Sequence, residues 1–150
     1  MYGLEEERVF QWTKKELQTK IDLGEGERIP TLEALIQLCQ YSPNMLLNIE
    51  LKGPLDESWE AHYDYDDAAS KVVSLIEKYD IASKTMISSF VPRILDSIAK
   101  AAPHSARKPR KFVIQSLRNR GGIEDPWKYV TDPGHTGVNM LYTRMTKQIV

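Results

Sequence analysis

The sequence is short of cysteine, of long apolar runs and of net charge, and each shortage excludes a class of protein. Its single cysteine, Cys39, cannot form an internal disulfide. No stretch approaches the roughly 18 apolar residues of a membrane-spanning helix, and the acidic start MYGLEEERVF lacks the apolar centre of a signal peptide. A formal net charge of −1 offers no positive field for a nucleic-acid backbone. We therefore expect a cytoplasmic protein with no transmembrane segment and no nucleic-acid partner.

A glycine-rich phosphate loop is absent as well. Gly24 and Gly26 stand in DLGEGERIP (22–30), a charged segment that predicts an exposed loop and does not follow a strand. The chain otherwise has the composition of a globular protein, with 150 residues of which 41% are hydrophobic and 27% charged. That length allows one domain with its own core and is too short for two ordinary domains.

Predicted strands and helices alternate along the chain. Short apolar runs predict strands over 45–51, 84–90, 111–117 and 137–142. Apolar residues at helical spacing predict a helix capped by Thr31 and two more over 67–79 and 91–101, with a polar connection over 53–66. This order predicts a parallel sheet whose active residues lie at the carboxyl ends of its strands.

The first predicted strand carries a polar residue at every second position. Asn48, Glu50 and Lys52 share one face of the strand because side chains alternate with a period of two. Burying an unpaired glutamate or lysine costs several kcal/mol, roughly, so each needs a charged partner. Two interpretations stay open: a divalent cation on Glu50 with a phosphate on Lys52, or a solvated edge face with a simple Glu–Lys pair.

Four segments resemble the glycerophosphodiester phosphodiesterase family, in the family's order. RIPTLEALIQLC followed by LLNIELKGP is similar to its middle signature, KTMISSFVPRIL resembles its next strand, and GVNMLYTRMTKQIV resembles its seventh-strand region. The resemblance covers residues 27–150 and implies an α/β fold. The implied architecture is an incomplete TIM-type (β/α) barrel with about four parallel strands, strands four to seven. Residues 1–26 are expected to form a lead-in segment.

The resemblance also implies a reaction and a set of site residues. The family cleaves glycerophosphodiesters such as glycerophosphocholine to glycerol 3-phosphate and an alcohol, with a divalent metal ion, Ca²⁺ or Mg²⁺. By resemblance Glu50 is a metal ligand and Lys52 is the catalytic residue beside the metal–phosphate site. Arg118, which follows the third strand, and Ser89, which ends the second, are expected to bind substrate. For Ser89 a turn and helix cap before Pro92 is the open alternative.

Two interpretations are also open for the aromatic residues of the connection after the first strand. Trp59, Tyr63 and Tyr65 can form a wall for a choline-type cation, or they can pack a lid loop. His62 lies in the same connection and is expected to face the carboxyl ends of the strands, or to be a solvated loop histidine. The basic loop that contains His104 is expected at the opposite end.

Several motifs of the family have no counterpart here. The H-R-G, E-x-D and H-D motifs precede the I-P-T-L signature in the family, and the residues before Pro30 contain no histidine. His62, His104 and His135 match none of the family's catalytic positions, and the W-T-[VI]-N segment of the eighth strand is missing. Because open strand edges expose unpaired backbone, we expect self-association or a partner chain. The alternative function is a non-catalytic binding or assembly subunit.

Overall fold

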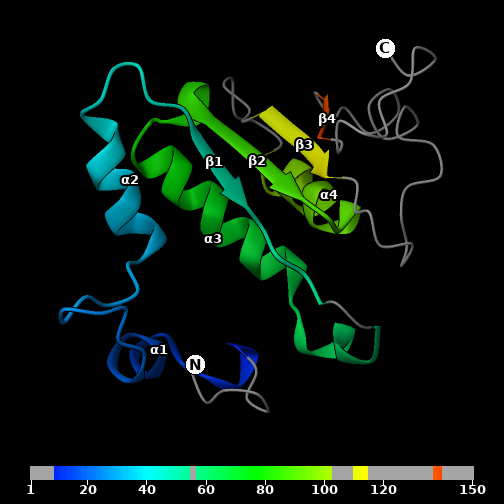
Figure 1. Ribbon diagram of the computed structural model, residues 1–150. Helices are drawn as coiled ribbons and strands as arrows, with labels where there is room; N and C mark the ends of the chain where they lie inside the picture. Colours follow the sequence, from blue (N-terminus) through cyan, green and yellow to red (C-terminus); the bar gives the residue numbers. More distant parts are fainter. Residues whose placement is uncertain (1–8, 55–56, 103–109, 115–136, 140–150) are drawn as a thin grey trace. The chain divides into compact units, whose positions relative to one another are not determined.

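The computed structural model describes residues 9–54, 57–102, 110–114 and 137–139 of the 150 (Figure 1). The chain divides into two compact units, Met1–Tyr41 and Ser42–Val150, and each is described by itself. The predicted lead-in segment over 1–26 stays a prediction. Within the described ranges, no helix has the length and apolar character needed to cross a membrane.

The first unit contains a 3-10 turn, η1 (Val9–Gln11), and two helices, α1 (Lys14–Lys20) and α2 (Leu32–Gln40). A capping box starts α1, because the Thr13 hydroxyl accepts from the Glu16 N–H and the Glu16 carboxylate accepts from the Thr13 N–H. The predicted cap of α2 is confirmed, since the Thr31 hydroxyl accepts from the Ala34 N–H at 3.0 Å.

The loop between α1 and α2 is a tight exposed turn. Asp22 and Arg28 form an isolated antiparallel bridge at its base. At its tip Gly24 and Gly26 have φ angles of 108° and 82°, in the region that favours glycine. The exposed loop predicted over 22–30 is therefore confirmed.

The second unit is built on a four-stranded parallel sheet in the order β1-β2-β3-β4. The strands are β1 (Leu47–Glu50), β2 (Thr85–Ser89), β3 (Arg110–Ile114) and β4 (Gly137–Asn139). All three neighbouring pairs are parallel, with Glu50 opposite Ser88 in the first pair. The predicted parallel sheet is confirmed, while predicted strand residues 115–117 and 140–142 lie outside the described residues.

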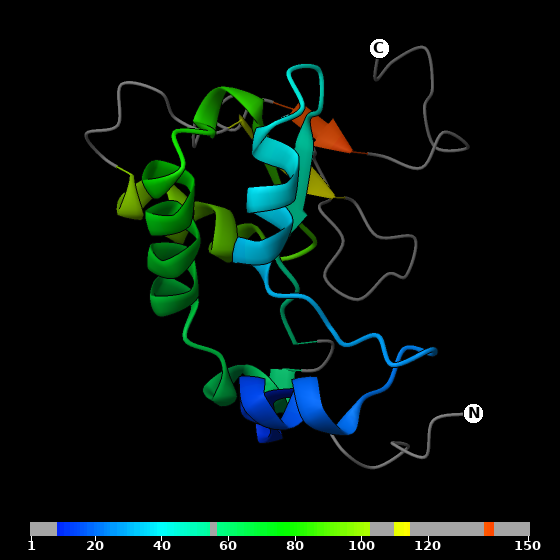
Figure 2. The same cartoon turned by 90° about the vertical axis from the view of Figure 1, so that its left-hand side faces the viewer.

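Two helices, α3 (Tyr65–Lys78) and α4 (Pro92–Ala101), connect the strands and pack against each other (Figure 2). Short 3-10 turns, η2 (Glu57–His62) and η3 (Ala82–Lys84), precede α3 and β2. Contacts of α4 with β2 and β3 place these helices on one face of the sheet. The core between the layers contains Ile49, Tyr65, Ala69, Val72, Val73, Ile76, Ile87, Ile94, Leu95 and Ile98.

Helix α3 begins two residues before the predicted start at residue 67. The Asp64 carboxylate accepts from the Asp67 N–H at 2.9 Å and caps the helix there. Tyr65 thereby becomes a residue of the first turn, and it is only 6% exposed. Helix α4 starts at Pro92, which is tolerated at this position because a first-turn N–H has no partner within the helix.

Candidate functional site

The carboxyl edge of β1 carries the charged pair that the sequence singled out. The Lys52 ammonium donates to the Glu50 carboxylate, and the two form an ion pair. The Glu50 side chain is 30% exposed and that of Lys52 71% exposed, so neither charge is fully buried. Each residue therefore has the other as its charged partner. The cation on Glu50 and the phosphate on Lys52 stay predictions. A cation on Glu50 would have to compete with Lys52 for the same carboxylate.

A polar face extends from Glu50 along β1 and onto β2. Asn48 lies two residues before Glu50, and its side-chain oxygen accepts from the Ser88 hydroxyl at 3.0 Å. Ser88 is fully buried and stands opposite Glu50 in the strand register. The alternation predicted for β1 is confirmed, since Ile49, on the other face, is 7% exposed and faces the core.

Ser89 has structural contacts on the other face of β2. Its hydroxyl donates to the Leu51 carbonyl at 2.7 Å and accepts from the Val91 N–H at 3.0 Å, and the residue is fully buried. These bonds join the segment after β1 to the residue before α4. They agree with the alternative in which Ser89 stabilises a turn and a helix start before Pro92. A role of Ser89 in substrate binding stays a prediction, and Ser88 is the serine on the face of Glu50.

Close packing at Gly53 holds the segment after β1 against the same turn. A Cβ atom at Gly53 would lie 2.6 Å from Val91 Cγ2 and 3.3 Å from Val91 Cβ. Both atoms belong to a branched side chain with little freedom to move aside. The position of Lys52 thus depends on the absence of a side chain at the next residue.

Replacing Gly53 by alanine is therefore expected to destabilise the second unit. We expect Gly53→Ala to lower the free energy of unfolding by about 1–3 kcal/mol, because the added methyl overpacks the contact with Val91. The measurement is urea unfolding of the full chain. Adding Val91→Ala to Gly53→Ala should restore part of the lost stability. If Gly53→Ala alone were as stable as the native chain, the close contact between Gly53 and Val91 would be contradicted.

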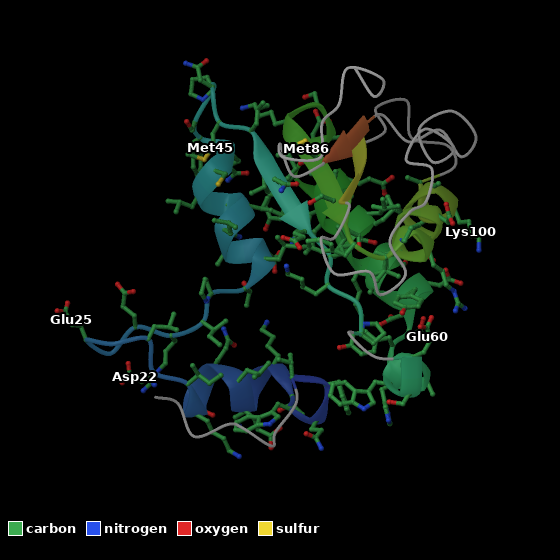
Figure 3. All side chains as sticks on the ribbon, turned by 45° about the vertical axis from the view of Figure 1, so that its right-hand side comes forward. Asp22, Glu25, Met45, Glu60, Met86 and Lys100 are labelled. Atoms are coloured by element: carbon green, nitrogen blue, oxygen red, sulfur yellow. The ribbon has the colours of Figure 1, made fainter. Side chains whose placement is uncertain are left out.

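Helices α3 and α4 and the turn η2 form a second cluster beside this edge. Arg93 donates to the Glu60 carboxylate at 3.1 Å, and its guanidinium carbon lies 5.2 Å from the Tyr65 ring centroid. A hollow of about 370 Å³ lies here, lined by residues 61–66, Arg93, Ser97 and Lys100. Figure 3 shows Glu60 and Lys100 on the same side of the second unit. The exposed His62 lines this hollow.

Tyr65 packs in the core from the first turn of α3, and not as part of a lid loop. Within the described part of the chain, its hydroxyl has no hydrogen-bond partner. Burial, together with the nearby Glu60 carboxylate, raises the pKa of Tyr65 from 10.0 to about 12. The folded state is therefore more stable with Tyr65 protonated than with Tyr65 ionised.

This shift predicts a loss of stability at alkaline pH. Between pH 10 and about 12 an unfolded tyrosine gives up its proton while folded Tyr65 retains it. The unfolded state then binds fewer protons, so stability falls as pH rises through this window, by up to about 1.4 kcal/mol per pH unit. We expect Tyr65→Phe to remove this part of the fall and to add about 1 kcal/mol at neutral pH. Urea unfolding from pH 8 to 12 measures both, and equal slopes would contradict the burial.

The described residues do not by themselves form a metal site. In the ranges that the structure describes, no three side chains of histidine, cysteine, aspartate or glutamate gather where they could hold a metal ion. Glu50 nevertheless has the chemistry of a Ca²⁺ or Mg²⁺ ligand, a partly exposed carboxylate at the carboxyl edge of a parallel sheet. Further ligands would have to come from outside the described ranges. Arg118, His104 and His135 also lie outside the described residues, so their predicted positions stay predictions.

A curated protein is similar in sequence to this chain. The chain is 33% identical over 116 residues to a protein of Caldanaerobacter subterraneus subsp. tengcongensis named glycerophosphodiester phosphodiesterase. The match covers 75% of this chain and 41% of that protein. No family model matches the chain.

Two solved structures share the fold. A candidate glycerophosphodiester phosphodiesterase from Galdieria sulphuraria matches 91% of this chain and 50% of its own, with a TM-score of 0.69 at 24% identity. For a glycerophosphodiester phosphodiesterase from Parabacteroides distasonis, the match covers 87% of this chain and 48% of that protein, with a TM-score of 0.65 at 23% identity. The chain spans about half the length, or less, of the relatives it matches. The resemblance predicted from the sequence is confirmed: the chain is similar to part of a glycerophosphodiester phosphodiesterase.

Proposed function

We propose that this chain, like the glycerophosphodiester phosphodiesterases to which it is similar, serves the metal-dependent hydrolysis of glycerophosphodiesters to glycerol 3-phosphate and an alcohol. The single observation that carries the proposal is the place of Glu50 and Lys52. Both lie at the carboxyl edge of a parallel sheet, in the N-I-E-L-K segment that resembles the family signature. The carboxyl edge is where βα folds keep their reactive groups.

In this function Glu50 would bind a Ca²⁺ or Mg²⁺ ion and Lys52 would contact a phosphoryl oxygen. The bound ion would stabilise negative charge on the phosphoryl oxygens. Lys52 would contribute a compact positive charge with rotatable N–H donors, which pairs with a phosphoryl oxygen as a point charge. Because Glu50 and Lys52 pair with each other, a cation and a phosphate would have to compete with this ion pair. Arg118 would add recognition of the anionic substrate from the segment after β3.

The proposed architecture is a TIM-type barrel in which β1 to β4 correspond to strands four to seven. Its support is the sequential parallel order of the described sheet and the fold shared with two structures about twice as long. In the described sheet β1 is an edge strand, and one side of its backbone has no strand beside it. Such an edge would pair with a further strand of the barrel, with a second copy or with another chain.

The test is hydrolysis of glycerophosphocholine by the full chain, with Ca²⁺, with Mg²⁺ and with a chelator. We expect release of choline and glycerol 3-phosphate that depends on the ion. Ion-dependent release supports the proposal. No release at any ion concentration would contradict it for this chain and would favour the second candidate, a binding or assembly subunit. The observation behind that candidate is the Glu50–Lys52 pair, which satisfies both charges without any ligand.

A further inference from the structure

Phe90 is a large apolar side chain that remains 44% exposed at the carboxyl edge of the sheet. It follows β2 directly, and the period of two places it on the same face as Met86 and Ser88. Glu50 stands opposite Ser88 in the register, so the next positions along this face are Lys52 and Phe90. The strand register alone therefore brings a cation and an aromatic ring together.

The side-chain geometry agrees with the register. Lys52 Nζ lies 5.4 Å from the centroid of the Phe90 ring, within the range of about 6 Å over which a ring attracts an ammonium. The same ammonium donates to the Glu50 carboxylate. With its side chain 71% exposed, Lys52 has little packing to select one rotamer. Within the described ranges, the Phe90 ring and the Glu50 carboxylate are the two groups that hold the Lys52 ammonium.

We propose that Phe90 is a positioning residue for Lys52: its ring keeps the ammonium at the carboxyl edge of the sheet. The two attachments differ in what a ligand does to them. A cation would compete with Lys52 for the Glu50 carboxylate, whereas the uncharged ring has no such competitor. With Glu50 engaged, Lys52 still has the ring as a contact and can present its N–H donors to a phosphate oxygen. This last consequence rests on the proposed function, and the contact itself does not.

The contact has a spectroscopic signature. Protons near an aromatic ring are displaced by its ring current, so the ε-methylene protons of Lys52 in the full chain should be displaced in NMR spectra. We expect Phe90→Leu, which keeps an apolar side chain of similar bulk, to abolish the displacement. Phe90→Tyr, which keeps the ring, should retain it. A native chain without the displacement, or a displacement that survives Phe90→Leu, would overturn the proposal.

Binding of inorganic phosphate, followed in the same spectra, measures the consequence. We expect its dissociation constant to rise about two- to fivefold in Phe90→Leu, the size of an exposed cation–π contact, and to stay unchanged in Phe90→Tyr. In a Lys52→Met background, Phe90→Leu should have no further effect. An equal effect in that background would overturn the proposal, because the ring would then act without Lys52. A native chain that shows the displacement but binds no phosphate upholds the contact and contradicts the proposed function.

Discussion

Glu50→Gln is expected to lower ion-dependent hydrolysis of glycerophosphocholine by about 100-fold or more. The substitution keeps the shape of the side chain and removes its charge, so a divalent cation at the proposed site would lose the carboxylate that the carboxyl edge of β1 provides. A loss of ~3 kcal/mol of transition-state stabilisation, within what a catalytic metal contributes, corresponds to this factor. The measurement is the initial rate of choline release at saturating Ca²⁺ or Mg²⁺, with calorimetric binding of the ion as a second readout.

The matched control is Glu77→Gln, the same change on the last turn of α3. Helix α3 runs back from the carboxyl edge, so its last turn lies toward the opposite edge of the sheet, and the rate should remain native. The free energy of unfolding of Glu50→Gln shows whether a lost rate comes from a lost ligand or from a misfolded chain. Losing a partly exposed ion pair changes this free energy by about 1 kcal/mol at most. Equal rates for Glu50→Gln and the native chain would exclude Glu50 from the reaction.

Ile87→Ala is expected to lower the free energy of unfolding of the second unit by about 2–5 kcal/mol. Ile87 lies in the middle of β2, is fully buried, and stands opposite Ile49 of β1 in the register. Truncation removes three buried carbon atoms and leaves a cavity between the sheet and the helices that pack on it. Such a loss is a large share of the roughly 5–15 kcal/mol that stabilise a typical domain.

The measurement is hydrogen exchange of the β2 amides, which reports on this unit separately from residues 9–41. Leu46→Ala is the control, because this leucine immediately before β1 is 63% exposed and its truncation should change stability by about 0.5 kcal/mol or less. Equal exchange rates in the two variants would mean that β2 does not form the centre of the core.

The residue pattern was sufficient to predict α2 and the alternation of strands and helices in the second unit, but it did not predict α1 or the 3-10 turns. Thr31 is a cap with apolar residues at helical spacing behind it, and the structure confirms α2 there. The four apolar runs became the four strands of a parallel sheet, since regular alternation of strands and helices leaves few other topologies. The I-P-T-L and N-I-E-L-K segments likewise predicted the similarity to glycerophosphodiester phosphodiesterases. These inferences depend on neighbours in sequence, which a sequence displays directly.

Only the tertiary structure decided which side chains meet at the candidate site. Two adjacent serines end β2, and their identities do not reveal that Ser88 joins Asn48 while Ser89 binds backbone groups of two other segments. The sequence shows Phe90 only as an apolar residue at a strand end, whereas the register with β1 places it beside Lys52. The physical reason is common to these cases. Contacts across a sheet depend on strand register and on how helices pack over it, and both follow from the burial of the whole core.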